Sequence, residues 1–179
     1  MVLWLDCTHG VTSAKVLAAL EALVSHGRTL HEVQRFMGSK TAQRRAHAVF
    51  EVLAQAEAAA HEVTLDEMHF HEVGRLTNLS RVVGIFAAFD MLGIEKWYCS
   101  PPVIGNGTVV CSHGELSIPA PATAYILERY GIPISPAPDT PLMGELTTPT
   151  GAALLTQVDG FCVNPPDSGH LCCARTVLS

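Results

Sequence analysis

Hydrophobic and polar positions follow patterns that change along the chain from strand to helix. The run VLWLD at residues 2–6 is apolar up to its last position, which predicts a buried strand that ends on a carboxylate. Apolar residues at helical spacing then predict helices over residues 16–24, 29–37, 39–60 and 76–89. Gly-containing breaks separate these stripes, as expected at helix ends.

The second half of the chain changes to β-branched residues, glycines and prolines. Residues 97–99 predict a strand, and the alternating stretches 108–111 and 115–118 predict a hairpin around the tripeptide SHG. Helices are predicted over residues 122–130 and from Pro149 onward. Because strands alternate with helices, the expected fold class is α/β, a sheet with packed helices.

Composition and charge exclude several classes of protein. Hydrophobic residues make up 48% and charged residues 16%, which favours a filled core over disorder. The net charge is −6 and the eleven Lys and Arg are scattered, so no nucleic-acid surface is expected. The longest uncharged apolar run, residues 82–89, is far below the roughly 18 residues that cross a bilayer. With no basic start for a signal peptide, and cysteines typical of buried thiols, a cytoplasmic location without membrane contact is predicted.

The carboxyl end of the first strand is one candidate site. In open α/β sheets ligands bind at that edge, so Asp6 becomes a candidate by position. An Asp that only shapes the following loop remains an equal alternative.

The sequence HFHEV at residues 69–73 is a second candidate. On an extended segment His69 and His71 point to the same side, where two nitrogens could hold one cation. On a helix they would diverge by about 200°. Glu72 could be a further ligand, a group that orients an imidazole, or a proton carrier. A structural polar turn is the alternative.

Two further segments have polar groups suited to anions. Glycines in VIGNGTV leave backbone amides open to a phosphate, and GELTTPTG combines a carboxylate and hydroxyls with a helix start. An isolated GxG and a helix cap are the simpler explanations, and His113 in the hairpin turn could merely be solvated.

The sequence contains the segments HFHEVG, VIGNGTVVCSHGELSIPAPAT and GELTTPTGAALL. Taken together, these three segments resemble the nickel-insertion proteins that complete the nickel-pincer nucleotide cofactor of lactate racemase and related enzymes. The resemblance covers residues 1 to about 158. It implies a lyase-like, CTP-dependent cyclometallation, in which nickel enters a pyridinium bis-thiocarboxylate mononucleotide and forms one carbon–nickel and two sulfur–nickel bonds. Nickel suits histidine ligands.

The resemblance also implies roles for particular residues. It implies metal contacts for three histidines, His69, His71 and His113, and catalytic roles for Glu72 and Glu145. It implies contacts with the nucleotide cofactor for Asp6, Gly105, Asn106, Gly107, Thr147, Thr148 and Thr150. Ni²⁺ and CTP with Mg²⁺ or Mn²⁺ are the implied cofactors. The implied partners are the pincer-precursor nucleotide, CTP, a separate second-domain chain or the apo-racemase, and a second copy of the chain in a homo-oligomer.

This sequence departs from the family pattern at several acidic positions. An SGDM-like loop usually follows the first Asp, whereas Ala14 and Lys15 stand here where its Asp and Met would fall. AVDSIVD commonly follows HEVG, whereas Thr77 and Arg81 replace its two carboxylates. Fewer carboxylates predict weaker binding of Mg²⁺, which leaves a non-catalytic metal- or nucleotide-binding scaffold as the alternative function.

The resemblance also predicts how the chain is divided. Residues 1–160 are expected to form one nickel-insertion-like domain. Relatives continue into a second, nickel-binding domain, whereas residues 161–179 match nothing in that pattern and are expected to form an irregular tail.

Overall fold

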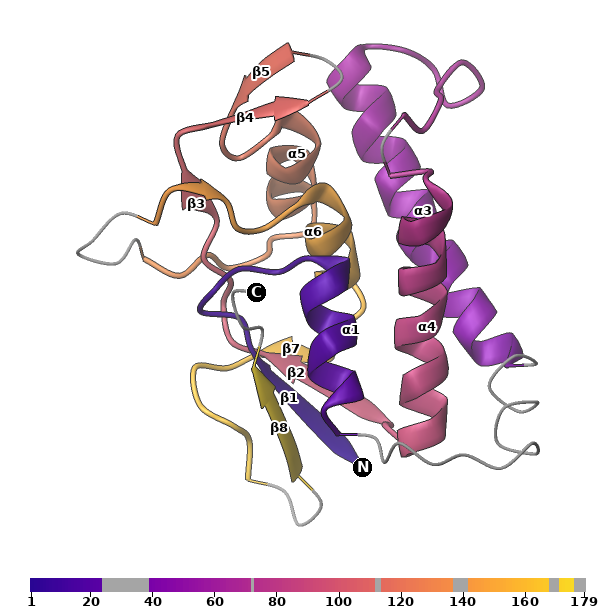
Figure 1. The fold of residues 1–179 in the computed structure, drawn as a ribbon, viewed down its shortest axis with the longest axis vertical. Coiled ribbons are helices and arrows are strands. Elements are labelled where there is room, and N and C mark those ends of the chain that lie inside the picture. Colours follow the sequence, from indigo (N-terminus) through magenta and orange to yellow (C-terminus); the bar gives the residue numbers. More distant parts are fainter. Residues whose placement is uncertain (24–38, 72, 112–113, 137–141, 168–170, 176–179) are drawn as a thin grey trace.

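The computed structural model describes residues 1–23, 39–71, 73–111, 114–136, 142–167 and 171–175 (Figure 1). Helices and strands alternate, which confirms the predicted α/β class. The helices are α1 (Ser13–Glu21), α3 (Lys40–His61), α4 (Leu76–Leu92), α5 (Pro121–Arg129) and α6 (Pro149–Leu155). The strands are β1 (Val2–Asp6), β2 (Lys96–Cys99), β3 (Gly105–Asn106), β4 (Thr108–Cys111), β5 (Gly114–Ser117), β6 (Gly144–Glu145), β7 (Gly160–Phe161) and β8 (Leu171–Arg175).

The main sheet has four parallel strands in the order β7-β2-β1-β8. Leu5 of β1 is opposite Cys99 of β2, and Val2 is opposite Leu171 of β8. Leu3 and Leu5 are fully buried and alternate with half-buried residues, as the period of two in a strand requires. The sheet therefore has one face in the hydrophobic core.

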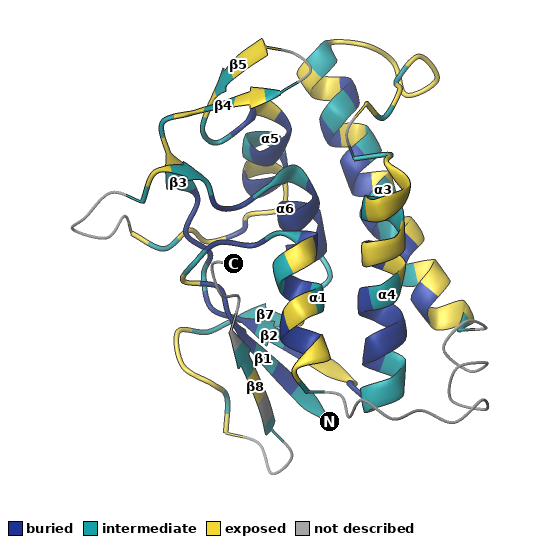
Figure 2. Cartoon of the chain, viewed as in Figure 1, coloured by how far each residue is buried: buried dark blue, intermediate teal, exposed yellow. Residues whose placement is uncertain are grey.

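Helices α3 and α4 pack against each other beside this sheet, and their buried stripes face inward (Figure 2). Ser39 caps α3, because its hydroxyl accepts a hydrogen bond from the amide of Ala42 at 3.0 Å. Gly93 ends α4 in the left-handed conformation at φ 64°. Phe89 of α4 meets Trp97 of β2 edge-on, with ring centroids 5.1 Å apart. This aromatic contact joins the helical layer to the sheet.

The predicted hairpin is confirmed, since β4 and β5 pair antiparallel from Thr108 opposite Ser117 to Cys111 opposite Gly114. Its turn lies outside the described residues, as does the helix predicted over residues 29–37. Helix α1 ends at Glu21, three residues before the predicted end. In the part of the chain that the structure describes, no helix is long and apolar enough to cross a membrane.

The end of the chain differs from the expected irregular tail. Residues 171–175 instead form β8, which pairs with β1 over its whole length. β8 is short. Its parallel pairing with β1 gives hydrogen-bond partners to the backbone groups of β1 on the side away from β2. The chain therefore places β1 in the interior of the sheet.

Candidate functional site

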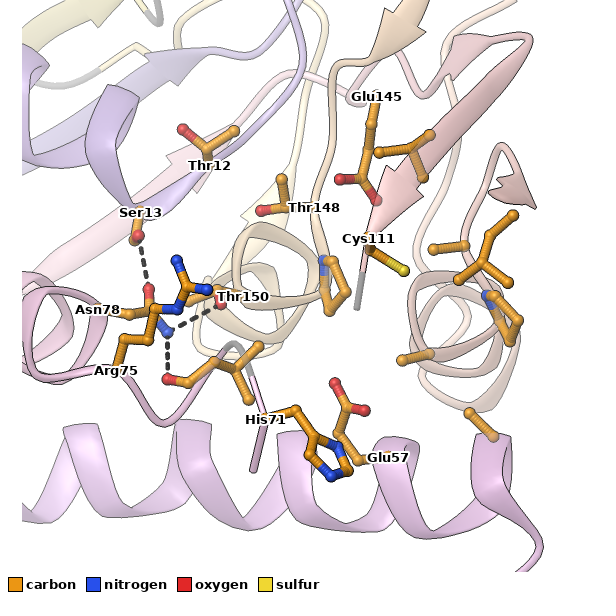
Figure 3. Close-up of a pocket in the computed structure, with 18 of the residues that line it drawn as sticks. Thr12, Ser13, Glu57, His71, Arg75, Asn78, Cys111, Glu145, Thr148 and Thr150 are labelled. Atoms are coloured by element: carbon orange, nitrogen blue, oxygen red, sulfur yellow. Dashed lines mark hydrogen bonds between the residues drawn. The ribbon is translucent and has the colours of Figure 1, made fainter. Parts of the chain in front are cut away.

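A pocket of about 680 Å³ lies between the starts of α1, α4 and α6, the end of α3 and the β4–β5 hairpin (Figure 3). Residues from HFHEV, from GELTTPT and from the hairpin line this one cavity, among them His71, Glu145, Thr148 and Cys111. Segments that are far apart in the sequence therefore meet here, as the resemblance implied.

The loop after β1 is hydrogen-bonded to the start of α6 beside the pocket. The Thr147 hydroxyl accepts a hydrogen bond from the amide of Val11 at 3.0 Å and donates one to the carbonyl of Val103 at 2.8 Å. The amide of Thr148 donates to the carbonyl of Val11 at 3.1 Å. Thr147 is fully buried and does not line the pocket, so it supports the wall and does not face a ligand.

Gly151 allows this close approach. A Cβ atom at that position would lie 1.8 Å from the carbonyl oxygen of Val11, which is inside the backbone of the facing loop. Only glycine fits where α6 contacts this loop. The threonine-rich helix start is therefore a packing feature as well as a candidate ligand site.

Asn78 connects three walls of the pocket (Figure 3). Its side-chain oxygen accepts a hydrogen bond from Ser13 at 2.9 Å, and its amide nitrogen donates to the carbonyl of Val73 at 2.7 Å and to the hydroxyl of Thr150 at 3.2 Å. These bonds join α1, the HFHEV segment, α4 and α6. The sequence pattern did not indicate this residue, because a lone Asn near a helix start carries no signal of its partners.

The imidazole of His71 lies in the pocket beside a second imidazole that the sequence pattern did not indicate. The rings of His61 and His71 have centroids 5.8 Å apart, and Nε2 of His61 lies 3.6 Å from a carboxylate oxygen of Glu57. Both Glu57 and His61 are in the last turns of α3 and line the pocket. Their i, i+4 spacing is typical of a solvated helix surface, which is why they were overlooked.

His71 lines the pocket and His69 does not. His69 is exposed, and its Nδ1 lies 2.8 Å from the carbonyl of Glu67. Glu72 and His113 lie outside the described residues. Within the described ranges, no three His, Cys, Asp or Glu side chains are grouped to hold a metal ion. The metal roles proposed for these residues stay predictions.

The remaining predicted residues divide into lining and supporting positions. Glu145, Thr148 and Thr150 line the pocket, and the Thr148 hydroxyl caps α6 by accepting from the amide of Gly151 at 3.2 Å. Asp6 is buried and accepts from the amide and hydroxyl of Thr8 at 3.0 and 2.7 Å, so it shapes the loop after β1.

The GNG segment supports the pocket from outside. Gly105 and Asn106 form β3 and pair with Glu145 and Gly144 of β6, and neither these two residues nor Gly107 lines the cavity. A Cβ on Gly105 would lie 2.0 Å from the carbonyl oxygen of Gly144, and its φ is +100°. This glycine is required for close strand pairing. The pairing in turn positions Glu145.

The acidic positions that this sequence lacks also map to the pocket. Ala14, Thr77 and Arg81 all line it. Neighbouring Lys15 turns its ammonium group to the carbonyl of His9 at 2.6 Å, and partial burial lowers the pKa of Lys15. The departures noted in the sequence thus change the charge of this cavity.

A family model described as nickel insertion protein matches residues 21–171. The chain belongs to the nickel insertion protein family. A pyridinium-3,5-bisthiocarboxylic acid mononucleotide nickel insertion protein of Staphylococcus epidermidis is 39% identical over 133 residues, which are 72% of this chain and 32% of that protein. The protein of the same name from Akkermansia muciniphila is 35% identical over 134 residues, 73% of this chain and 32% of that one.

A relative from Roseiflexus castenholzii is 43% identical over 138 residues, 75% of this chain and 34% of that protein. This member of the nickel insertion protein family thus spans about a third of the length of the curated relatives that it matches. No solved structure matches the chain. The matched range contains every pocket wall except the start of α1.

Proposed function

We propose that this chain takes part in nickel insertion into a pyridinium bis-thiocarboxylate mononucleotide, with CTP consumed in the reaction. The main support is that HFHEV, GELTTPT and the β4–β5 hairpin, which carry the resemblance, contribute His71, Glu145 and Val109 to one cavity. Two relatives that share this region are named for nickel insertion and for a pyridinium-3,5-bisthiocarboxylic acid mononucleotide. A cytoplasmic location, a homo-oligomer and the apo-racemase or a second-domain chain as partner belong to the same proposal.

Nickel is a substrate in this proposal, and His61 and His71 are its first protein ligands. Imidazole nitrogen suits nickel, and the two rings approach each other at the pocket wall. A metal that must be handed to another molecule is better held by few ligands than by a closed cage. The thiocarboxylate sulfurs of the nucleotide would supply the remaining donors. His69, His113 and Glu72 are kept as proposed contacts for the metal or its proton exchange.

The oxygen-rich wall suits a nucleotide that carries Mg²⁺ or Mn²⁺. Mg²⁺ keeps several waters and usually takes one or two carboxylates in addition to phosphate oxygens. Glu145 and Thr148 offer such oxygens in the pocket and are the groups that we propose would hold it. Bound Mg²⁺ would neutralise the charge of the CTP phosphates. The pairing of β6 with β3 supports this proposal, because it holds the backbone of Glu145 beside the pocket.

The test is to incubate the purified chain with the precursor nucleotide, Ni²⁺, CTP and Mg²⁺, and to detect the nickel-containing nucleotide by mass spectrometry. Calorimetric titration with Ni²⁺, Zn²⁺ and Mn²⁺ measures the metal step separately. A matched control is His47→Ala, because His47 lies on the same helix as His61 and faces Glu51 with the same i, i+4 spacing, outside the pocket. Absence of both nickel binding and product would refute the proposal.

The alternative is a non-catalytic scaffold that binds metal or nucleotide. It is favoured by one observation, that Ala14, Thr77 and Arg81 occupy pocket positions where carboxylates were expected. Consumption of CTP separates the two functions. Binding of nickel and nucleotide with no CTP consumed and no product would support the scaffold.

A further inference from the structure

Two arginines on one wall of the pocket have no acidic partner among the described residues. Arg75 and Arg81 both line the cavity, both are exposed, and neither forms an ion pair in the part of the chain that the structure describes. Figure 3 shows the Arg75 side chain beside the hydrogen bonds that join Ser13, Asn78 and Thr150. Their positive charges are therefore available to a ligand.

Both arginines belong to the N-terminal part of α4. Arg75 is the residue that precedes α4, and Arg81 is one turn beyond Thr77, which also lines the pocket. Long side chains in a helix lean back toward its N-terminus, so we expect the Arg81 side chain to lean toward the first turn of α4. The helix dipole adds a partial positive charge at the same end.

The opposite part of the pocket has a different character. Glu57 and Glu145 lie apart from Arg75 in Figure 3, and the imidazoles are near Glu57. Figure 3 therefore separates the Arg75 guanidinium from the carboxylates of Glu57 and Glu145 and from the imidazole of His71. A ligand that fits has a metal-binding portion and a separate anionic portion.

We propose that Arg75 and Arg81 bind the phosphate monoester of a mononucleotide and so fix which end of the substrate faces the imidazoles. This inference rests on the proposed function, because the relatives are named for a mononucleotide. Guanidinium is the side-chain group best suited to phosphate, since its planar fork makes two parallel hydrogen bonds. Thr12 and Thr77 also line the pocket and add hydroxyl groups to it.

The experiment uses a stable probe, a pyridinium carboxylate mononucleotide, and the matching nucleoside without phosphate. Both are titrated calorimetrically in metal-free buffer. The wild-type chain should bind the nucleotide at least about tenfold more tightly than the nucleoside, because charged hydrogen bonds carry that much affinity. Arg75→Ala and Arg81→Ala should each weaken nucleotide binding roughly tenfold, and the double variant should bind both probes alike.

Two variants act as controls for folding and specificity. Arg81→Lys keeps the charge and should retain part of the preference for phosphate, whereas Arg129→Ala removes an exposed arginine of α5 outside the pocket and should change nothing. Equal binding of both probes by the wild type, no binding of the nucleotide, or an unchanged preference in the double variant would each overturn the inference.

Nickel titration of the same proteins keeps this inference distinct from the proposed function. Arg75→Ala/Arg81→Ala should keep wild-type affinity for Ni²⁺, because the imidazoles lie in the other region of the pocket. A protein that prefers phosphate but binds no nickel would refute nickel insertion and leave the arginine assignment in place.

Discussion

The imidazole of His71 meets that of His61 edge-on, with ring centroids 5.8 Å apart and ring planes at 69°. This contact joins the segment after α3 to the last turn of that helix. It also pairs His71 with a residue ten positions away, whereas the sequence pattern suggested its neighbour His69. Which histidines lie close enough to act together therefore depends on tertiary contacts and not on spacing in the sequence.

The first prediction concerns these imidazoles. His61→Ala and His71→Ala should each weaken Ni²⁺ binding by at least about tenfold. Loss of a residue that only hydrogen-bonds to a metal ligand commonly lowers metal affinity by about that factor, and loss of a direct ligand should cost no less. His69→Ala should have a smaller effect, since that ring lies outside the pocket lining. Calorimetric titration at fixed pH measures all three, with His47→Ala as the control. Equal losses for His69→Ala and His61→Ala would contradict the assignment.

Local signals were enough to predict most helices and strands. Ser39 and Gly93 mark the ends of α3 and α4, and the alternation in β4 and β5 indicated their pairing. These features depend on neighbours within a few residues, which the sequence displays directly. β8 was not predicted, because its stability depends on pairing with β1 from the far end of the chain.

The candidate site could be predicted only in part. The motifs that contain His71, Glu145 and Thr148 were identified, and all three residues line the pocket. His61 and Asn78 were missed, since their importance arises from contacts across long sequence separations. Glycine-rich and threonine-rich segments do not distinguish a ligand site from a packing contact, because the same residues can bind phosphate or permit close backbone packing.

The second prediction concerns Asn78. Asn78→Ala removes three hydrogen bonds and leaves Ser13, Val73 and Thr150 without that partner. The free energy of unfolding should fall by about 1–3 kcal/mol, the usual cost of leaving partly buried polar groups unpaired. Urea denaturation measures the change. Ser80→Ala on the exposed surface of the same helix should be nearly neutral, and an equal loss there would contradict the role assigned to Asn78.

The third prediction concerns the buried thiol of Cys99. Burial is the main cause that raises the pKa of Cys99 well above its ordinary value of 9.0, and the neighbouring thiol of Cys7 is the second cause. The unfolded chain would release this proton at lower pH than the folded one. This contribution to stability is therefore complete below about pH 9 and is lost as the pH rises above it.

Cys99→Ala should accordingly flatten the fall in stability above about pH 9, which denaturation at several pH values measures. In the native protein at pH 8, alkylation should modify exposed Cys173 well before Cys99, as peptide mass spectrometry would show. Early modification of Cys99 would mean that its thiol is accessible and that burial does not control its ionisation.

The fourth prediction contrasts two helical glycines. Intrinsic helix propensity alone would make alanine better than glycine by about 1 kcal/mol at either position. At Gly84 the added Cβ would meet only Cδ1 of Leu17 at 3.7 Å, an ordinary contact, so Gly84→Ala should stabilise the protein by about 0.5–1 kcal/mol.

At Gly151 the added Cβ would lie 1.8 Å from the carbonyl oxygen of Val11, and a backbone atom cannot rotate away. Overpacking then outweighs propensity, and Gly151→Ala should destabilise by about 3 kcal/mol or more. It should also separate Thr148 from the loop after β1 and weaken ligand binding in the pocket. Thermal and urea unfolding of both variants provide the measurement. A Gly151→Ala variant that is as stable as the wild type, or more stable, would show that α6 does not contact that loop as closely as described.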